Sequence, residues 1–206
     1  MTNVTIIDYG LGNIQSIANM VKRVGGIAEI ACSSRDIQKA QKLILPGVGA
    51  FDHGMNLLHK KNFIPVLKKK IVKDGIPILG ICLGAQLFMS NSEEGKLKGL
   101  GWIEGNVRKF VFNNPQLLKV PHVGWNTIQI KKKCPLLTKM KNGSRFYFTH
   151  SYYIDVSSKE DVVATTEYGI EFVSIFNKDT LYGVQFHPEK SHVFGMALIK
   201  NFLTMT

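Results

Sequence analysis

The sequence predicts an α/β fold with a mixed, mainly parallel central sheet that is flanked by helices and extended by antiparallel strands. Over the first 90 residues, short apolar and β-branched stretches alternate with stretches of helical periodicity, which is the pattern of parallel strands joined by helices. Beyond residue 100, strand-like stretches follow one another with only turns between them, which is typical of antiparallel strands. Ligands of such folds bind at the carboxyl ends of the parallel strands, so we expect functional residues at that edge.

The first half contains four expected strands, and an expected helix follows the first, the second and the fourth of them. A turn at 8–13 separates the first strand from the first helix, and the pair Gly25-Gly26 ends that helix. Residues 33–36 can cap the second helix, and the fourth strand leads directly into the third helix. The expected strands are 2–7, 27–31, 43–45 and 75–81, and the expected helices begin at Ile14, at Ser33 and at Cys82, the last reaching about Ser90.

The second half contains six strand-like stretches and one helix. No linker rich in Ser, Pro or Gly separates it from the first half, and no internal repeat is visible. We therefore expect one domain that spans residues 1–206. The expected strands are 102–112, 126–131, 145–156, 162–166, 172–177 and 181–186, and the helix runs from about Ser191 to Leu203.

The composition is that of an ordinary globular protein, with 45% hydrophobic and 20% charged residues, which argues against disorder, collagen-like repeats and coiled coils. Three cysteines cannot form a disulfide framework, and no secretory leader is visible at Met1 to Gly10. Both observations favour a reducing cytoplasm. The longest apolar run, 75–88, is interrupted by Gly, Pro and Gln and is too short to span a bilayer. We therefore expect a cytoplasmic protein without a membrane segment.

The net charge of +11 is unevenly distributed along the chain. Residues 105–154 hold nine basic residues and no acidic one, whereas the rest of the chain has 17 basic and 15 acidic residues. Such an excess suggests a nucleic acid or a membrane as partner. However, no nucleic-acid-binding motif is present, and the lysine clusters lack the interleaved aromatic residues of a stacking platform.

A second cluster of basic residues lies on a predicted helix, where a solvated helix face is the simpler interpretation. It comprises Lys60, Lys61, Lys68, Lys69, Lys70 and Lys73.

The clearest chemical signal is the segment Gly80-Ile81-Cys82-Leu83-Gly84, which follows an apolar strand and precedes a helical stretch. It has the pattern of a nucleophile elbow, with Cys in place of Ser. A sharp, strained turn needs neighbours without a Cβ atom, which explains the two glycines, and the N–H groups of the following helix favour a thiolate. A small, inert cysteine on a glycine-rich turn is the competing interpretation.

A nucleophilic thiol needs a base, and the base needs an orienting group. His187 lies at the end of a predicted strand, at the same sheet edge as Cys82, and Glu189 can turn back across Pro188 to bond the other ring nitrogen. A core or capping histidine is the alternative. The other histidines are weaker candidates: His53, His59 and His192 lie on expected helices, and His122 and His150 lie in loop-like contexts.

A glycine-rich turn, Pro46-Gly47-Val48-Gly49, follows the strand at 43–45. Its glycines allow the Val48 N–H to approach a bound oxyanion or to turn towards it. The N–H of Leu83, which follows the nucleophile, is the natural second donor. Alone, such a turn is weak evidence, because glycine-rich turns after strands are common.

Together these three motifs resemble those of the class I glutamine amidotransferases, whose flavodoxin-like fold carries a Cys-His-Glu triad. The resemblance extends to residues 120–126 (VPHVGWN), 146–153 (FYFTHSYY) and 183–191 (GVQFHPEKS). Over essentially the whole chain, the sequence is similar to the glutaminase subunits of imidazole glycerol phosphate synthase, a family of the histidine pathway. The motifs are highly specific when they occur together in this order.

The resemblance implies a glutaminase that uses neither a metal nor a cofactor. Cys82 would attack the side-chain amide of glutamine, His187 would take the thiol proton and return it to the departing ammonia, and Glu189 would hold the imidazole. The backbone N–H groups of Val48 and Leu83 would bind the oxyanion. The residues implied in holding the amino-acid head of glutamine are Gly49, Gln86, Glu94, His150 and Ser151.

The resemblance also implies a heterodimer in which ammonia crosses an interface to a cyclase subunit with a (β/α)8 barrel. Lys190 matches a lysine that pairs with a carboxylate on the barrel, and the other matching interface residues are Asn13, Trp125, Asn126 and Tyr147. As a hypothesis, the acid-free stretch 105–154 partly faces an acidic surface of that partner. The resemblance further predicts that the Val48 N–H is not aimed at the site until the partner's ligand reshapes the turn.

Three other interpretations stay open. Duplicated copies of this subunit in bacterial surface-polysaccharide clusters would supply ammonia for an amidine on an activated or acidic sugar, and the segment Lys190 to Gly195 resembles that branch. A non-catalytic scaffold or nucleic-acid binder would account for the net charge, but not for an intact Cys-His-Glu set. A cysteine peptidase or deglycase of similar fold is disfavoured by Gln86, Glu94 and the segment His150-Ser151.

Overall fold

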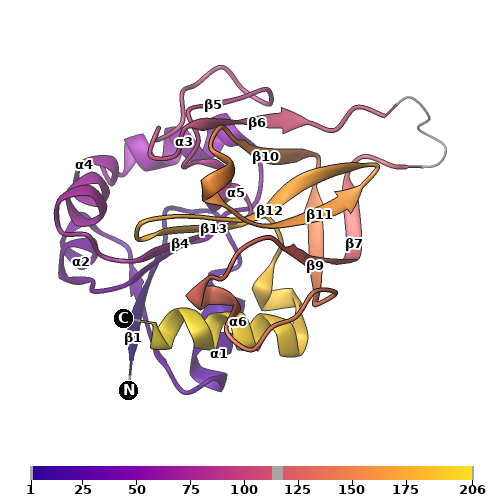
Figure 1. Ribbon diagram of the computed structural model, residues 1–206. Coiled ribbons are helices and arrows are strands. Elements are labelled where there is room, and N and C mark those ends of the chain that lie inside the picture. Colours follow the sequence, from indigo (N-terminus) through magenta and orange to yellow (C-terminus); the bar gives the residue numbers. More distant parts are fainter. Residues whose placement is uncertain (1, 113–117, 206) are drawn as a thin grey trace.

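The computed structural model describes residues 2–112 and 118–205, and its centre is an eleven-stranded sheet (Figure 1). Five neighbouring strands, in the order β2-β1-β3-β4-β13, run parallel to one another. This arrangement confirms the parallel half of the predicted sheet. The five strands are β1 (Asn3–Ile7), β2 (Ile27–Ala31), β3 (Leu43–Leu45), β4 (Ile78–Ile81) and β13 (Leu181–Val184).

Antiparallel strands extend the sheet beyond β13, as the sequence predicts. The order continues through β12, β10 and β6 to β5, β11 also pairs with β12, and β8 pairs with β11. Strands β5 and β6 pair in parallel, and β7 and β9 form a separate two-stranded antiparallel sheet. The bounds are β5 (Asn91–Ser92), β6 (Gly105–Lys109), β7 (His122–Thr127), β8 (Gln129–Ile130), β9 (Arg145–His150), β10 (Tyr152–Val156), β11 (Val162–Tyr168) and β12 (Ile170–Lys178).

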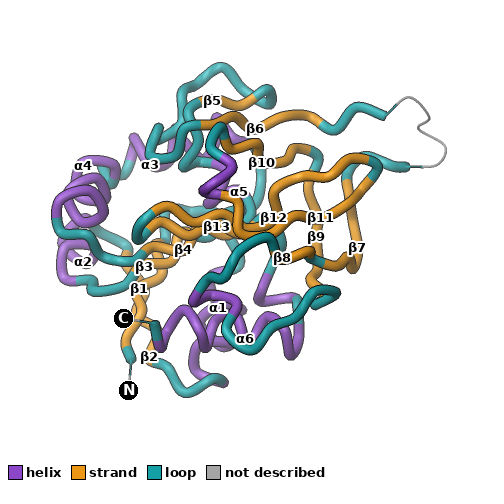
Figure 2. Tube along the Cα trace, in the orientation of Figure 1, coloured by secondary structure: helices purple, strands orange, loops and turns teal. Residues whose placement is uncertain are grey.

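Helices cover both faces of the parallel half (Figures 1 and 2). Successive residues of a strand point to opposite faces, so Ile6 packs in the core formed with α1 and α6, whereas Ile7 packs in the core formed with α2, α3 and α4. The helices are α1 (Ile14–Arg23), α2 (Ser34–Lys39), α3 (Phe51–Lys60), α4 (Ile64–Lys68), the π-helix Lys69–Lys73, α5 (Leu83–Gln86) and α6 (His192–Thr204), with 3-10 turns at Pro135–Leu137, Lys159–Asp161 and Pro188–Lys190.

Several predicted boundaries need correction. The expected strands 126–131 and 145–156 each cover parts of two strands that belong to different sheets, and the second is interrupted at Ser151. The strands expected from residues 75 and 102 begin only at Ile78 and Gly105. The expected helix from Cys82 ends at Gln86. Beyond Gln86, the N–H groups of Phe88 and Met89 bond the carbonyls three residues back, and the carbonyls of residues 87–89 accept from the N–H groups of residues 100–103, so no further α-helical turn forms.

Polar side chains fix two helix ends. Ser33 and Asp36 form a capping box at the start of α2, where the sequence predicts a cap. At the end of α6, the buried Lys42 ammonium donates to three carbonyls of residues 202–205 at 2.6–3.0 Å. These carbonyls have no partner within the helix, so Lys42 ties the chain just before β3 to the C-terminal helix.

The lysine cluster on α3, α4 and the π-helix is only partly a solvated face. Lys70 is buried, with its ammonium 3.5 Å from the Asp74 carboxylate, and the Lys61 ammonium donates to the Asp8 carbonyl at 2.9 Å. The other four lysines of the cluster are exposed. Within residues 2–112 and 118–205, no helix combines the length and the apolar character needed to cross a membrane.

Candidate active site

The nucleophile elbow predicted at residues 80–84 is the turn between β4 and α5. Cys82 has φ 52° and ψ −113°, a conformation that residues with a side chain rarely adopt. Packing requires both glycines, because a Cβ on Gly80 would lie 2.6 Å from the Ala85 Cα, and a Cβ on Gly84 would lie 1.9 Å from the Leu45 carbonyl oxygen. The strained turn therefore depends on the absence of side chains at these two positions.

The glycine-rich turn after β3 packs directly against this elbow. A Cβ on Gly47 would lie 2.5 Å from the Gly84 nitrogen. The buried Tyr9 hydroxyl donates to the Pro46 carbonyl at 2.9 Å and so supports the turn from below the sheet edge. Gly49 has φ +109° with open space beside it, so backbone conformation rather than packing explains this glycine.

His187 and Glu189 form a buried pair. The Nδ1 atom of His187 lies 2.9 Å from Oε1 of Glu189, and both side chains are almost completely buried. Burial opposes the charged imidazole, but the interactions with the Cys82 sulfur and with the Glu189 carboxylate together outweigh it and raise the pKa of His187 above its ordinary value. The Nε2 atom of His187 has no hydrogen-bond partner among the described residues. This nitrogen is therefore available for proton transfer.

Strand β9 holds the backbone around His187. The His187 N–H donates to the Tyr147 carbonyl at 2.9 Å. The buried Ser191 hydroxyl donates to the His187 carbonyl at 2.6 Å and accepts from the Tyr147 N–H at 3.0 Å. Sequence reasoning gave Ser191 no role, because a single serine after a turn forms no distinctive pattern.

A cavity of about 460 Å³ opens beside Cys82. Residues of the elbow, of the glycine-rich turn and of the junction between β9 and β10 line it. The structure therefore brings together the predicted nucleophile and all the residues predicted for the oxyanion and the substrate, namely Cys82, Val48, Leu83, Gly49, Gln86, Glu94, His150 and Ser151. The buried His187 and Glu189 are not among the lining residues.

Two polar side chains of the cavity are held by other groups of the protein. Oε2 of Glu94 accepts from the Phe51 N–H at 2.9 Å, and burial raises the pKa of the Glu94 carboxyl above its ordinary value. Nε2 of Gln86 donates to the Tyr152 carbonyl at 3.0 Å and to Oε1 of Gln185 at 3.2 Å. Both donor hydrogens of Gln86 are thus engaged, and its Oε1 remains as the atom that can accept from a ligand.

His122 and His150 lie in strands β7 and β9, and the loop-like contexts expected from the sequence are wrong. The two residues face each other in register, with Nδ1 of His122 3.2 Å from Nε2 of His150. Burial lowers the pKa of His122 to about 4 and that of His150 to about 3, so both rings are neutral at neutral pH. Gly124 lies within β7 at φ 134°.

Most residues expected at a partner surface gather on β7, β9 and the start of α6. Trp125 is 40% exposed and stacks on His192 with ring centroids 5.4 Å apart. The Arg145 guanidinium lies 5.8 Å from the centre of the Trp125 ring, and the Lys190 ammonium lies 5.5 Å from the centre of the Tyr147 ring. These side chains form one aromatic and cationic surface next to the backbone of His187.

Two other residues expected at the partner surface, Asn13 and Asn126, are not part of this aromatic and cationic surface. The Asn126 amide donates to the Glu167 carbonyl at 2.9 Å, so it is engaged within the protein. Asn13 directly precedes α1, in the loop whose Gly12 packs so closely on Pro46 that a Cβ there would lie 2.7 Å from the proline. Asn13 is therefore placed beside the glycine-rich turn.

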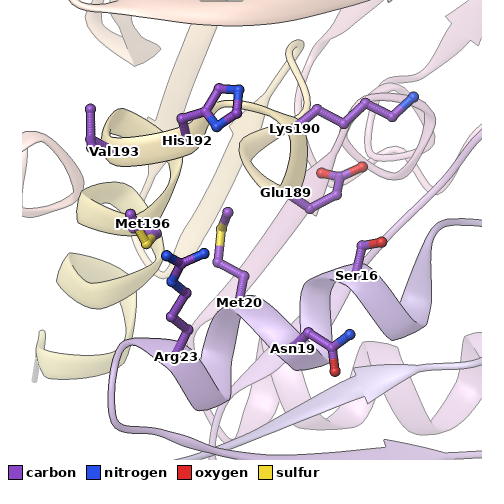
Figure 3. Close-up of a pocket in the computed structure, with 9 residues that line it drawn as sticks. All are labelled: Ser16, Asn19, Met20, Arg23, Glu189, Lys190, His192, Val193 and Met196. Carbon is purple, nitrogen blue, oxygen red and sulfur yellow. The ribbon is translucent and has the colours of Figure 1, made fainter.

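A second cavity, of about 430 Å³, lies between α1 and the start of α6. Figure 3 shows Glu189 and Lys190 next to each other on the turn before α6, with Ser16, Met20 and Arg23 of α1 opposite. Glu189 thus borders this second cavity and also forms a hydrogen bond with His187.

Within the described ranges, no three His, Cys, Asp or Glu side chains form a group that could hold a metal ion.

The protein's own carboxylates pair with part of the excess positive charge. In the acid-free stretch, Arg108 pairs with Asp155, and the Lys131 ammonium lies 2.7 Å from the Glu171 carboxylate. Arg145, by contrast, lies with the exposed aromatic residues. The charge available to a partner is therefore smaller than the count along the sequence suggests.

The fold and the site together define a class of protein. A sequence model of the family "Glutamine amidotransferase class-I" matches residues 5–205. "Imidazole glycerol phosphate synthase subunit HisH 2" of Methanococcus maripaludis is 50% identical over 97% of this chain and 98% of its own length, and the protein of the same name from Pseudomonas aeruginosa is 45% identical over 98% and 99%. The chain belongs to the class I glutamine amidotransferases, and within them to the HisH family.

A solved structure supports the fold independently. The structure of PurLQS from Thermotoga maritima superimposes with a TM-score of 0.74 over 98% of each chain, at 15% sequence identity. At this identity the likeness concerns the fold alone. It confirms the predicted class of a mixed sheet flanked by helices.

Replacing Glu189 by Gln is expected to lower the pKa of His187. The Glu189→Gln substitution keeps the shape of the side chain but removes the negative charge that favours the charged imidazole. The ring of His187 then loses its proton at lower pH than in the wild type, which an NMR titration of histidine-labelled protein measures. Cys82→Ser is expected to shift the titration in the same direction. An unchanged titration in both variants would contradict this account of the pair.

Proposed function

We propose that this chain is the glutaminase subunit of an imidazole glycerol phosphate synthase and that it releases ammonia from glutamine for histidine biosynthesis. Relatives named as HisH subunits, matched over nearly the whole chain, support the identity. The main structural support for this reaction is the strained conformation of Cys82 beside a cavity. At the same sheet edge, Nδ1 of His187 lies 2.9 Å from Oε1 of Glu189.

In the first proposed step, the Cys82 sulfur attacks the side-chain amide carbon of glutamine. The thiol proton passes to Nε2 of His187, which has no partner among the described residues. Glu189 accepts from the Nδ1–H of the same ring, so it orients the imidazole and stabilises its positive charge. The raised pKa of His187 favours this ion pair.

The amide oxygen carries negative charge in the resulting tetrahedral intermediate. We assign its stabilisation to the backbone N–H groups of Leu83 and Val48, whose residues line the cavity on the elbow and on the glycine-rich turn. A rotation of the turn that directs the Val48 N–H into the site, after the partner's ligand has bound, stays a prediction. The positive φ of the neighbouring Gly49 makes such a rotation sterically inexpensive.

Collapse of the intermediate breaks the C–N bond. His187 returns the proton to the departing nitrogen, ammonia leaves, and a thioester remains on Cys82. A water molecule, with its proton taken by His187, then attacks the thioester carbon and releases glutamate and the free thiol. No electron transfer occurs, so no redox cofactor is needed.

The amino-acid head of glutamine is proposed to bind at the opposite end of the cavity. The Oε1 atom of Gln86 and the Glu94 carboxylate are acceptors suited to an ammonium group. Gly49 and the backbone at His150 and Ser151 complete this set, and all five residues line the cavity. This arrangement would leave the side-chain amide of the substrate next to Cys82.

We propose that the partner is a cyclase subunit with a (β/α)8 barrel and that ammonia passes directly to it. The proposed contact surface consists of Asn13, Trp125, Asn126, Tyr147 and Lys190. Its exposed aromatic and cationic character suits a protein interface.

We also propose that residues 1–206 form a single domain, because the central sheet includes strands from both ends of the chain. The three free thiols suit a reducing compartment, and we propose the cytoplasm.

The polysaccharide-linked alternative is not favoured. The relatives carry the names of imidazole glycerol phosphate synthase subunits. Packing also explains part of the segment that suggested the alternative, because a Cβ on Gly195 would lie 1.9 Å from the Pro188 carbonyl oxygen. This glycine therefore carries no information about the destination of the ammonia. The membership of the HisH family likewise disfavours a scaffold or a peptidase.

Replacing Cys82 by Ser is expected to abolish glutamate release in the assembled complex. A hydroxyl is a far weaker nucleophile than a thiolate at neutral pH, so turnover should fall by at least about 10³-fold. Cys32→Ser is the matched control, because Cys32 is exposed and lies outside the cavity. Undiminished turnover in Cys82→Ser would exclude the proposed chemistry.

The same assay also identifies the product. With the purified partner and its nucleotide substrate present, the wild-type pair should form imidazole glycerol phosphate, and the Cys82→Ser pair should form it only from added ammonia. Glutamate release without this product would indicate the polysaccharide-linked alternative.

The rate at which the chain associates with its partner is expected to fall as ionic strength rises. Lys190 belongs to the proposed contact surface, and Arg145 lies beside Trp125 of that surface. A complementary acidic surface would attract both side chains over distances of about 10 Å. Stopped-flow measurements between low and physiological salt test this expectation. A flat dependence would refute an acidic partner surface.

A further inference from the structure

The side chain of Gln185 has no part in the steps above, yet it lies against the nucleophile. It is 0% exposed, and its Nε2 atom lies 3.9 Å from the sulfur of Cys82. Its backbone N–H donates to the Ser174 carbonyl at 2.9 Å, so the main chain is fixed as well. A buried amide destabilises a protein unless its polar atoms form hydrogen bonds. The position of the Gln185 amide beside the Cys82 sulfur therefore suggests a role for this contact.

The Tyr152 carbonyl determines how the side-chain amides of Gln86 and Gln185 are oriented. The Tyr152 carbonyl can only accept, so the Gln86 atom 3.0 Å away must be the nitrogen. The same nitrogen donates to Gln185 at 3.2 Å, so the atom of Gln185 that faces it must be Oε1. The other end of Gln185 is then Nε2, which directs an N–H at the Cys82 sulfur.

Two neutral histidines support the same carbonyl from the other side. Nδ1 of His150 lies 2.8 Å from the Tyr152 carbonyl and must donate to it. Because the ring is neutral, its Nε2 accepts from Nδ1 of His122, whose own Nε2 accepts from the Asn126 amide at 3.3 Å. Two series of hydrogen bonds thus meet at the Tyr152 carbonyl, which accepts from His150 on one side and from Gln86 on the other. Gln86 donates in addition to Gln185, so turning either amide over would leave a buried polar group unpaired.

We propose that Gln185 is a positioning residue for the nucleophile, whose amide N–H favours the Cys82 thiolate and keeps the sulfur directed at the cavity, with Gln86 fixing the orientation of that amide. A donor beside a charged sulfur stabilises the thiolate relative to the thiol. The other titratable groups that act on the sulfur are His187 and Tyr9. This inference rests on the proposed role of Cys82 as the nucleophile.

The test is the pH dependence of Cys82 alkylation by iodoacetamide in the full chain. The thiolate displaces iodide, so a C–S bond forms as the C–I bond breaks, and the rate follows the thiolate fraction. Mass spectrometry of the Cys82 peptide is needed, because the exposed Cys32 also reacts. In Gln185→Met, which keeps the length of the side chain without its donor, the half-maximal rate should move about one pH unit higher.

Two further variants complete the experiment. Gln86→Met leaves the donor present but removes the group that orients it, so a smaller shift in the same direction is expected. Gln129→Met alters an exposed glutamine of β8 and should leave the profile unchanged. Thermal unfolding of each variant shows whether it is folded. If Gln185→Met does not fold, Gln185→Leu replaces it, because leucine is an apolar side chain of similar volume without a donor or a charge.

An unshifted profile in a folded Gln185 variant would overturn the inference. The result does not depend on glutaminase activity, because iodoacetamide has no amino-acid head and alkylation needs no turnover. Failure of the proposed function would instead appear as undiminished glutamate release in Cys82→Ser. The two failures are therefore distinguishable.

Discussion

The contact between two backbone turns is the constraint on which this active site depends. The elbow after β4 lies against the end of β3 and the glycine-rich turn that follows it. A Cβ on Gly84 would lie 1.9 Å from the Leu45 carbonyl oxygen, and a Cβ on Gly47 would lie 2.5 Å from the Gly84 nitrogen. This contact sets the position of Cys82 relative to Val48, and hence the place where a substrate oxygen would meet two N–H groups. The Cys82 N–H also donates to the Val184 carbonyl at 2.8 Å, so the parallel sheet itself supports the strained residue.

A second constraint links the site to the proposed partner surface. Strand β9 presents Tyr147 to that surface, while its backbone bonds His187 and Ser191. The same strand ends at His150, which supports the carbonyl that orients Gln86. A partner that shifted β9 would therefore act together on His187, the proposed base, and on the cavity proposed for the substrate. Coupling of this kind needs no rearrangement of the parallel sheet.

Local patterns in the sequence were sufficient to predict part of this site, and contacts between distant segments were not predictable. The glycines around Cys82 and the His187–Glu189 pair are recognisable because each pattern lies within a few consecutive residues. The contact with Leu45 that also requires Gly84 was not predictable. Gln185 and Ser191 act through groups that the fold brings from far along the chain, so no short pattern indicates them. The strand that contains His122 was missed because Pro and Gly on either side are typical of turns.

The central claim is that Cys82, at the meeting point of the two turns, forms a covalent bond with the carbon of the substrate amide. The most direct measurement is a crystal structure of the complex with its partner after reaction with a glutamine analogue that carries an electrophilic ketone in place of the amide. The account predicts a bond from the Cys82 sulfur to the ketone carbon, with the oxygen about 3 Å from the N–H groups of Leu83 and Val48. An analogue attached elsewhere, or an oxygen that faces away from both groups, would contradict it.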